Sequence, residues 1–172
     1  MRLVRARRAL LQAQAHFGSV KKSVNNPLAF RDAFVAFIGM ASRVGSIIDG
    51  ETRTHRLSSF GDFWKSTQKD SLHMFVREVR NAEFKEARVR TRYQGRGYIT
   101  TESKGVKLQI VFGDNEAFLM LAPETLTPPD HNEATWAFVG GEFDGQDVLV
   151  IMERYLAWLR DSILPEAERL TA

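Results

Sequence analysis

Residues 27–48 show the clearest helical repeat in the chain. Asn26 suits the N-cap position and Pro27 the first helical position. Small residues such as Gly39 and Gly45 would allow another helix to approach closely. Apolar residues recur at intervals of three and four, which is the period of one helical face. They are Phe30, Phe34, Phe37, Ile38, Ala41, Val44 and Ile48. The repeat therefore predicts a long core helix.

Three further segments have helical patterns. Residues 2–17 form the first predicted helix, and Gly18 is its expected stop. A long amphipathic segment from about residue 60 to 90 forms the third. The last begins near residue 148 and lines its buried side with apolar residues as far as Ile163, where Pro165 is expected to disrupt it.

Between the third and fourth predicted helices the period changes from helical to alternating. Residues 106–112 alternate apolar and polar side chains, and glycine-containing turns flank them at Gly105 and Gly113. A proline-rich segment at 122–134 is predicted to be a loop, and 135–139 a last strand. We therefore predict a mainly α (α+β) fold: a four-helix bundle with a small antiparallel β-meander inserted at about 97–140, within one domain spanning 1–172.

Composition narrows the chemistry available to the chain. With 172 residues and no cysteine, it has length for one sizeable core but no disulfide or thiolate ligand. No continuous apolar run approaches about 20 residues, so we expect no membrane partner and a cytoplasmic location. The four histidines are scattered, and no glycine-rich phosphate loop occurs. We therefore expect no metal and no cofactor.

Charge is distributed unevenly along the chain. Residues 1–107 contain 21 Lys and Arg against 9 Asp and Glu, whereas residues 108–172 contain 3 against 12. The basic part could form a face for a polyanion such as RNA. Alternatively, the two parts attract each other within one fold or across a dimer.

The third predicted helix contains the best candidate site, Arg80-Asn81 followed by Lys85. Here the chain resembles the HEPN superfamily of four-helix bundles, in which an Arg, often followed by Asn, precedes a His by four to six residues near the end of the third helix. Many members are metal-independent ribonucleases that dimerise, so that two such pairs face one cleft. The resemblance implies Arg80, Asn81 and Lys85 as catalytic residues, and a homodimer.

One departure from the family pattern changes the expected chemistry. Lys85 stands where the family has His, and an unperturbed Lys, with a pKa of about 10.4, cannot accept a proton near pH 7 as imidazole does. Lys85 could still hold a phosphate. His73 lies two turns before Arg80 on the same predicted helix, so we do not expect it to replace the family His. The structural alternative is that Arg80 pairs with Glu83 or Asp147.

A basic run follows, and it combines cations with aromatic residues. Arginine and aromatic side chains together suit single-stranded RNA, through phosphate pairing and base stacking. The alternative is a solvated helix end. The residues predicted to contact nucleic acid are Arg88, Arg90, Arg92, Tyr93 and Arg96.

Three functions remain open from the sequence. The first is a HEPN-like protein of bacterial or phage type that binds RNA or a protein partner with little or no catalysis. The second is an active metal-independent ribonuclease of a toxin or defence system. The third is a homo-oligomeric assembly module without a nucleic-acid function.

Overall fold

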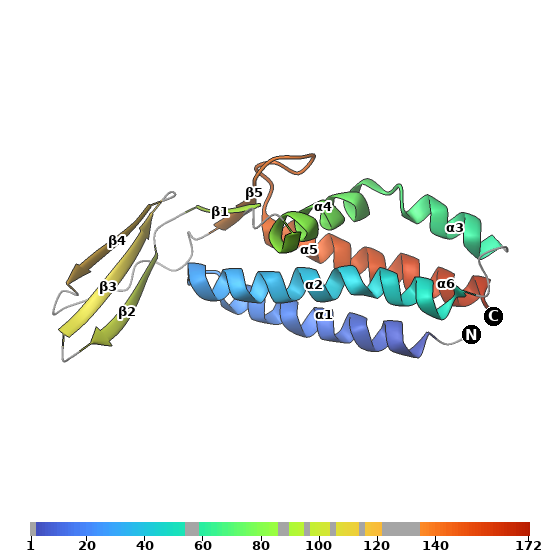
Figure 1. Ribbon diagram of the computed structural model, residues 1–172, viewed down its shortest axis with the longest axis horizontal. Coiled ribbons are helices and arrows are strands. Elements are labelled where there is room, and N and C mark those ends of the chain that lie inside the picture. Colours follow the sequence, from blue (N-terminus) through green and yellow to red (C-terminus); the bar gives the residue numbers. More distant parts are fainter. Residues whose placement is uncertain are drawn as a thin grey trace.

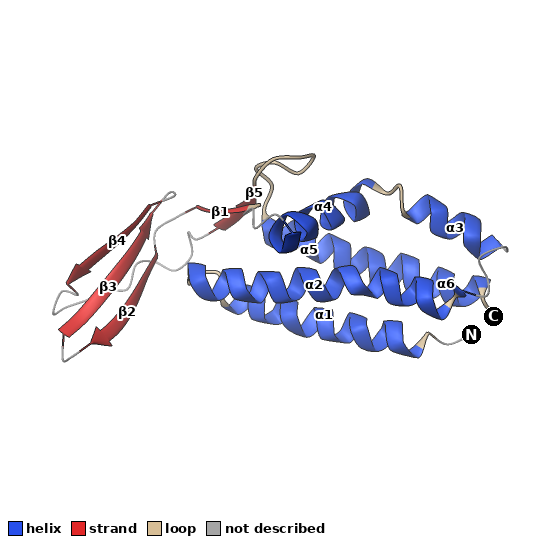
Figure 2. Cartoon of the chain, in the orientation of Figure 1, coloured by secondary structure: helices blue, strands red, loops and turns tan. Residues whose placement is uncertain are grey.

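The computed structural model describes residues 3–53, 59–85, 90–94, 97–103, 106–113, 116–121 and 135–172, with the backbone alone for the strands within 94–121. In these ranges the chain is mainly helical, with five helices and small antiparallel sheets (Figure 1, Figure 2). The predicted class, mainly α with a small β part, is confirmed at that level.

The first two helices lie side by side (Figure 1). They are α1, Val4–Lys22, and α2, Pro27–Glu51. Asn26 caps α2 as predicted, because its side chain accepts a hydrogen bond from the Ala29 N–H at 3.1 Å. The predicted stop at Gly18 is wrong. A helical glycine costs only about 1 kcal/mol, and continuing the helix buries Val20 completely.

The long third helix is divided into two. α3 covers Ser59–Thr67 and α4 covers Ser71–Lys85. The Thr67 hydroxyl donates to the Trp64 carbonyl at 2.8 Å at the end of α3, and the Asp70 carboxylate accepts from the His73 N–H at 3.1 Å at the start of α4. These local bonds satisfy backbone groups that a continuous helix would have paired. The expectation of one helix from about 60 to 90 is therefore corrected.

The C-terminal helix is continuous through a π-helical turn. Its parts are α5, Val148–Ala157, η2, Trp158–Ile163, and α6, Leu164–Leu170. Asp147 caps it by accepting from the Val150 N–H at 3.0 Å. Pro165, which has no N–H to donate, lies in the first turn of α6 just after the π-helical turn, and the helix continues past it. The predicted disruption at Pro165 is therefore wrong.

The strands form two antiparallel sheets. β2 (Gly97–Ser103), β3 (Val106–Gly113) and β4 (Glu116–Leu121) pair in sequence order, as the predicted meander requires. β5 (Thr135–Phe138) does not join them but pairs with β1 (Thr91–Gln94), a strand that the sequence did not predict. Figure 1 shows β2–β4 beyond the end of the helices, with the β1–β5 pair between that sheet and the helices.

Aromatic side chains connect the β1–β5 pair to the helices. The Trp136 ring on β5 stacks on Phe30 of α2 with centroids 3.9 Å apart, and its Nε1–H donates to the Val24 carbonyl at 3.0 Å. Phe138 packs edge-on against Phe75 of α4 at 4.9 Å. Such aromatic packing fixes the point where the β-insert leaves the helices.

Charged pairs join the two ends of the chain. Lys21 of α1 lies 2.9 Å from the Glu153 carboxylate on α5, and the Arg7 Nε–H donates to Glu168 on α6 at 2.8 Å. The basic N-terminal and acidic C-terminal parts therefore meet within the chain, which is part of the structural explanation for the uneven charge. Each exposed pair contributes up to about 1 kcal/mol.

α2 has the length and hydropathy of a membrane-spanning helix, although charged and polar residues interrupt its apolar run. It has 25 residues, and 39% of its most apolar window is buried inside the protein. A core helix of a soluble protein has the same properties, so α2 by itself places the chain in neither environment.

Candidate functional site

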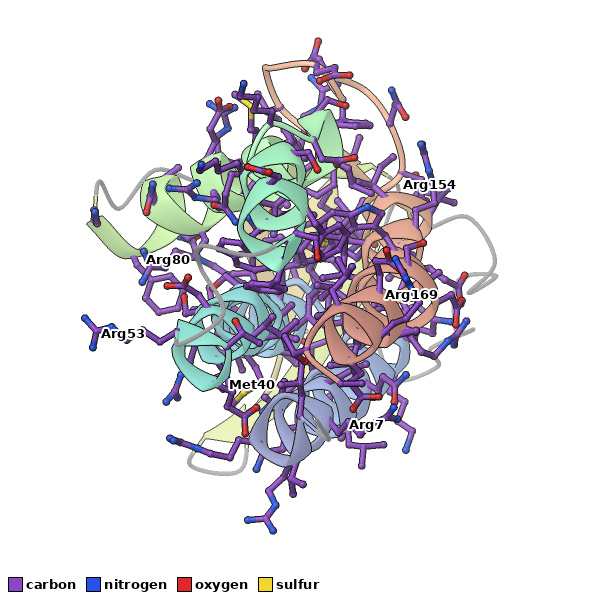
Figure 3. All side chains as sticks on the ribbon, turned by 90° about the vertical axis from the view of Figure 1, so that its right-hand side faces the viewer. Arg7, Met40, Arg53, Arg80, Arg154 and Arg169 are labelled. Atoms are coloured by element: carbon purple, nitrogen blue, oxygen red, sulfur yellow. The ribbon has the colours of Figure 1, made fainter. Side chains whose placement is uncertain are left out.

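A polar groove of about 330 Å³ lies between α2 and α4, with α3 beside one end. Figure 3 shows Arg80 on this flank of the molecule, opposite Arg154 of α5. All three residues predicted as catalytic line the groove. The complete lining is Ser42, Arg43, Gly45, Ser46, Asp49, Trp64, Gln68, His73, Arg77, Arg80, Asn81 and Lys85.

Helical spacing explains why these side chains meet. On α4, Arg77 follows His73 by four residues, and Arg80 follows Arg77 by three, so they share one face. Asn81 and Lys85 extend that face by one further turn. On α2, the lining residues recur at the same three- and four-residue intervals. One polar face of α2 and one polar face of α4 thus form the two long sides of the groove.

The groove is cationic. Four of its side chains are positively charged, Arg43, Arg77, Arg80 and Lys85, against one carboxylate, Asp49. No carboxylate in the described ranges forms an ion pair with any of the four cations. Like charges repel, so an anion placed among them would be bound favourably.

Two of the arginines are oriented by amide oxygens. The Arg80 Nη1–H donates to Asn81 Oδ1 and the Arg77 Nη1–H donates to Gln68 Oε1, each at 3.0 Å. A guanidinium has five N–H donors, so one such bond leaves others for a ligand. The Arg80 guanidinium also lies 6.0 Å from the centroid of the Phe84 ring. Asn81 therefore helps to position Arg80.

The structural alternative for Arg80 is wrong within the described ranges. Glu83 does not pair with Arg80: one of its oxygens accepts from the Arg90 backbone N–H at 3.2 Å, and the other lies 3.5 Å from Arg31. Asp147 is the cap of α5. Both proposed carboxylate partners are thus engaged elsewhere.

His73 lies at the closed side of the groove and is 4% exposed. Its Nδ1 is 3.1 Å from the hydroxyl oxygen of Tyr155 on α5. Burial, and then the positive charge of Arg77, lower the pKa of His73, while Asp70 opposes this shift. Burial also raises the pKa of Tyr155 well above its usual value. Both groups are therefore neutral at pH 7.

The three predicted nucleic-acid contacts that the structure describes, Arg90, Arg92 and Tyr93, do not form one exposed surface. Arg90 is half-buried and its Nη2–H donates to the Gly140 carbonyl at 3.4 Å, while Arg92 is exposed on β1. The Tyr93 ring is 8% exposed and packs edge-on against Trp136 at 5.2 Å, which places it in the core and not on a surface for base stacking. Arg88 and Arg96 lie outside the described residues.

Among the groove residues that sequence reasoning did not assign to the site are Arg43, His73 and Arg77. The signal for His73 and Arg77 was available, because seven residues span almost two turns and bring His73 onto the face of Arg80. Arg43 had no such signal, since it lies on a different helix. No group of three metal-ligating side chains occurs among the described residues.

Comparison of the chain with family models, curated proteins and solved structures found no match. The groove is therefore the feature from which we infer a function.

Proposed function

We propose that the protein is a HEPN-like RNA-binding protein with little or no catalytic activity, and that the groove between α2 and α4 is its phosphate-binding site. The observation that carries the proposal is that Arg80, Asn81 and Lys85 share one groove with two further arginines, Arg43 and Arg77. Arginine forks bind phosphate oxygens in pairs, and lysine adds a point charge.

We also propose the finer fold that the resemblance implies. In this proposal α1, α2, α4 and the C-terminal helix are the four helices of the bundle, α3 is an additional short helix, and the strands are the insert between α4 and α5. The same resemblance leads us to propose a homodimer in the cytoplasm. Light scattering of the purified protein tests the dimer, and a monomer mass at micromolar concentration would contradict it.

The alternative function is a metal-independent ribonuclease. It is favoured by one observation, that an imidazole lines the same groove as Arg80. Such a reaction needs a group that takes the proton from the attacking 2′-hydroxyl. The hydrogen bond between His73 and Tyr155 weighs against that role, because a tyrosine hydroxyl that donates to Nδ1 leaves the ring proton on Nε2, which then cannot accept another.

An assay of binding and cleavage separates these functions. Labelled structured RNA is incubated separately with the unchanged protein and with the Arg80→Ala and Lys85→Ala variants, and a chelator is present in each sample. Arg154→Ala is the matched control, because Arg154 is an exposed arginine of α5 on the opposite flank (Figure 3). Our proposal predicts binding without cleavage, weakened about tenfold by Arg80→Ala and unchanged by Arg154→Ala.

Two results would favour a different function. Cleavage that Arg80→Ala abolishes would favour the ribonuclease. Failure of all four proteins to bind RNA would leave the assembly module, whose charge pairs already join α1 to the C-terminal helix.

A further inference from the structure

α2 and α4 approach each other closely beside and beneath the groove. The Phe84 ring lies so close to Gly39 that an added Cβ would be 3.0 Å from it. Within the groove, an added Cβ on Gly45 would be in ordinary contact, at 3.6 Å, with His73 of α4 and with Trp64 of α3. The inner part of the groove is therefore narrow, and it suits a small group that enters from the open side.

The His73 ring presents a hydrogen-bond donor to that small group. The buried, neutral Tyr155 hydroxyl is hydrogen-bonded to His73 Nδ1, and we infer that it donates to that nitrogen, because its proton would otherwise have no acceptor among the described residues. The neutral imidazole then carries its own proton on Nε2. Gly45, which would contact His73 Cε1, lines the groove with His73 itself, and Nδ1 is taken by Tyr155, so Nε2 is the ring nitrogen left for a ligand.

We propose that the groove recognises a terminal phosphate monoester of an RNA strand, with His73 Nε2–H and Arg77 contacting the phosphate at its inner end. This inference rests on the proposed RNA-binding function and names the part of the RNA that is bound. The ligand chemistry is a phosphate monoester, which the 5′ or 3′ end of a strand or a free nucleotide can supply.

Charge supports a monoester over the internal diester. A monoester near neutral pH carries a charge of about −1.5 to −2 and three terminal oxygens, whereas each internal phosphate carries one negative charge. The groove offers four cations against the one carboxylate of Asp49, one neutral ring donor, and the hydroxyl of Ser46, whereas the Ser42 hydroxyl donates to the Gly39 carbonyl at 3.0 Å. An internal diester would leave more of this positive charge uncompensated than a monoester would.

Competition binding tests the proposal. One internally labelled RNA sequence is prepared with a 5′-phosphate, with a 3′-phosphate, and with hydroxyls at both ends. Adenosine 5′-monophosphate and inorganic phosphate are the competitors. We expect at least one phosphorylated end to bind about tenfold more tightly than the hydroxyl-ended RNA. A weaker effect of the free nucleotide would identify the strand end as the source, and an equal effect would identify nucleotides.

Variants locate the effect. Arg77→Ala removes an exposed side chain of the groove, and His73→Gln keeps a neutral polar group but changes the donor's position. Both should lose the preference for a phosphorylated end, and Arg154→Ala should keep it. Circular dichroism checks that each variant folds. If His73→Gln does not fold, two other single variants decide the question: Arg77→Ala, and Ser46→Leu, whose larger side chain fills the groove.

The outcomes separate the two proposals. Equal binding of all three RNA ends would overturn the terminal-phosphate inference and leave the RNA-binding function in place. A preference that persists in Arg77→Ala would also overturn it, because the end would then bind elsewhere. Failure of every RNA to bind would overturn the proposed function itself.

Discussion

His73 Nδ1 lies 3.1 Å from the hydroxyl oxygen of Tyr155, so a residue of the groove is hydrogen-bonded to the C-terminal helix. Tyr155 is fully buried, and its ring stacks near that of Trp158. The groove thus has one inner residue whose position and protonation depend on the core. Its arginines, by contrast, lie on the solvent side of α2 and α4.

Stability should fall as the solution becomes acidic, and His73 should cause part of the fall. Its pKa is lowered in the folded protein, so below about pH 6.5 the unfolded chain takes up a proton that the folded protein does not. Stability is therefore fully present above that pH and is lost as pH falls toward the folded pKa. His73→Gln should flatten this part of the curve, as measured by urea unfolding between about pH 5 and 7.5. His16→Gln on α1 is the control, and an equal flattening there would refute the assignment.

Removing the Tyr155 hydroxyl should destabilise the protein. Tyr155→Phe leaves the ring in place but deprives the buried His73 Nδ1 of its partner, at a cost of about 1–3 kcal/mol in the free energy of unfolding. Tyr93→Phe is a matched control, because the buried Tyr93 hydroxyl has no hydrogen-bond partner in the described part of the chain. That change should be neutral or stabilising. Equal losses in the two variants would mean that the hydrogen bond contributes nothing specific.

Two glycine substitutions should have opposite signs. Gly45→Ala in α2 should stabilise the protein by about 0.5–1 kcal/mol, because alanine favours the helix and its Cβ would make ordinary contacts at 3.6 Å. Gly141→Ala should destabilise it by about 1–2 kcal/mol, because Gly141 has a φ of 82° and its Cβ would lie 3.2 Å from Arg90. Thermal unfolding of both variants checks the signs. A loss of stability in Gly45→Ala would show that the α2–α4 contact is tighter than described.

The fold was predictable where the signal was local. The Asn26 cap and the repeat from Phe30 to Ile48 identified α2, because capping and side-chain period depend on neighbouring residues. The break between α3 and α4 also had a local signal, because Asp70 is an N-capping residue type and lies three residues before His73. The apolar pattern continues on both sides of Asp70, and it therefore favoured one long helix. β1 could not be found in this way. It has four residues, and its structure depends on pairing Tyr93 with Trp136.

The site was predictable on one helix only. Arg80, Asn81 and Lys85 lie close in sequence, and their common face follows from helical geometry. The contribution of Arg43 depends on how α2 crosses α4, and the orientation of His73 depends on Tyr155, which is far along the chain. Such contacts join residues that are far apart in the sequence, so the spacing of residues along one helix does not predict them.

The most direct test of the account is the salt dependence of RNA binding in two charge-matched triple variants. One replaces Arg43, Arg77 and Arg80 of the groove with Ala, and the other replaces Arg154, Arg160 and Arg169 of the C-terminal helix. Both remove three exposed or half-buried arginines. Each phosphate contact to a single strand contributes about 0.7 to the slope of log affinity against log salt concentration. We predict that the groove variant loses at least about 0.7 of slope, the contribution of one bound phosphate, while the C-terminal variant keeps the original slope. Equal slopes in the two variants would show that RNA is not bound in the groove, and would contradict the account.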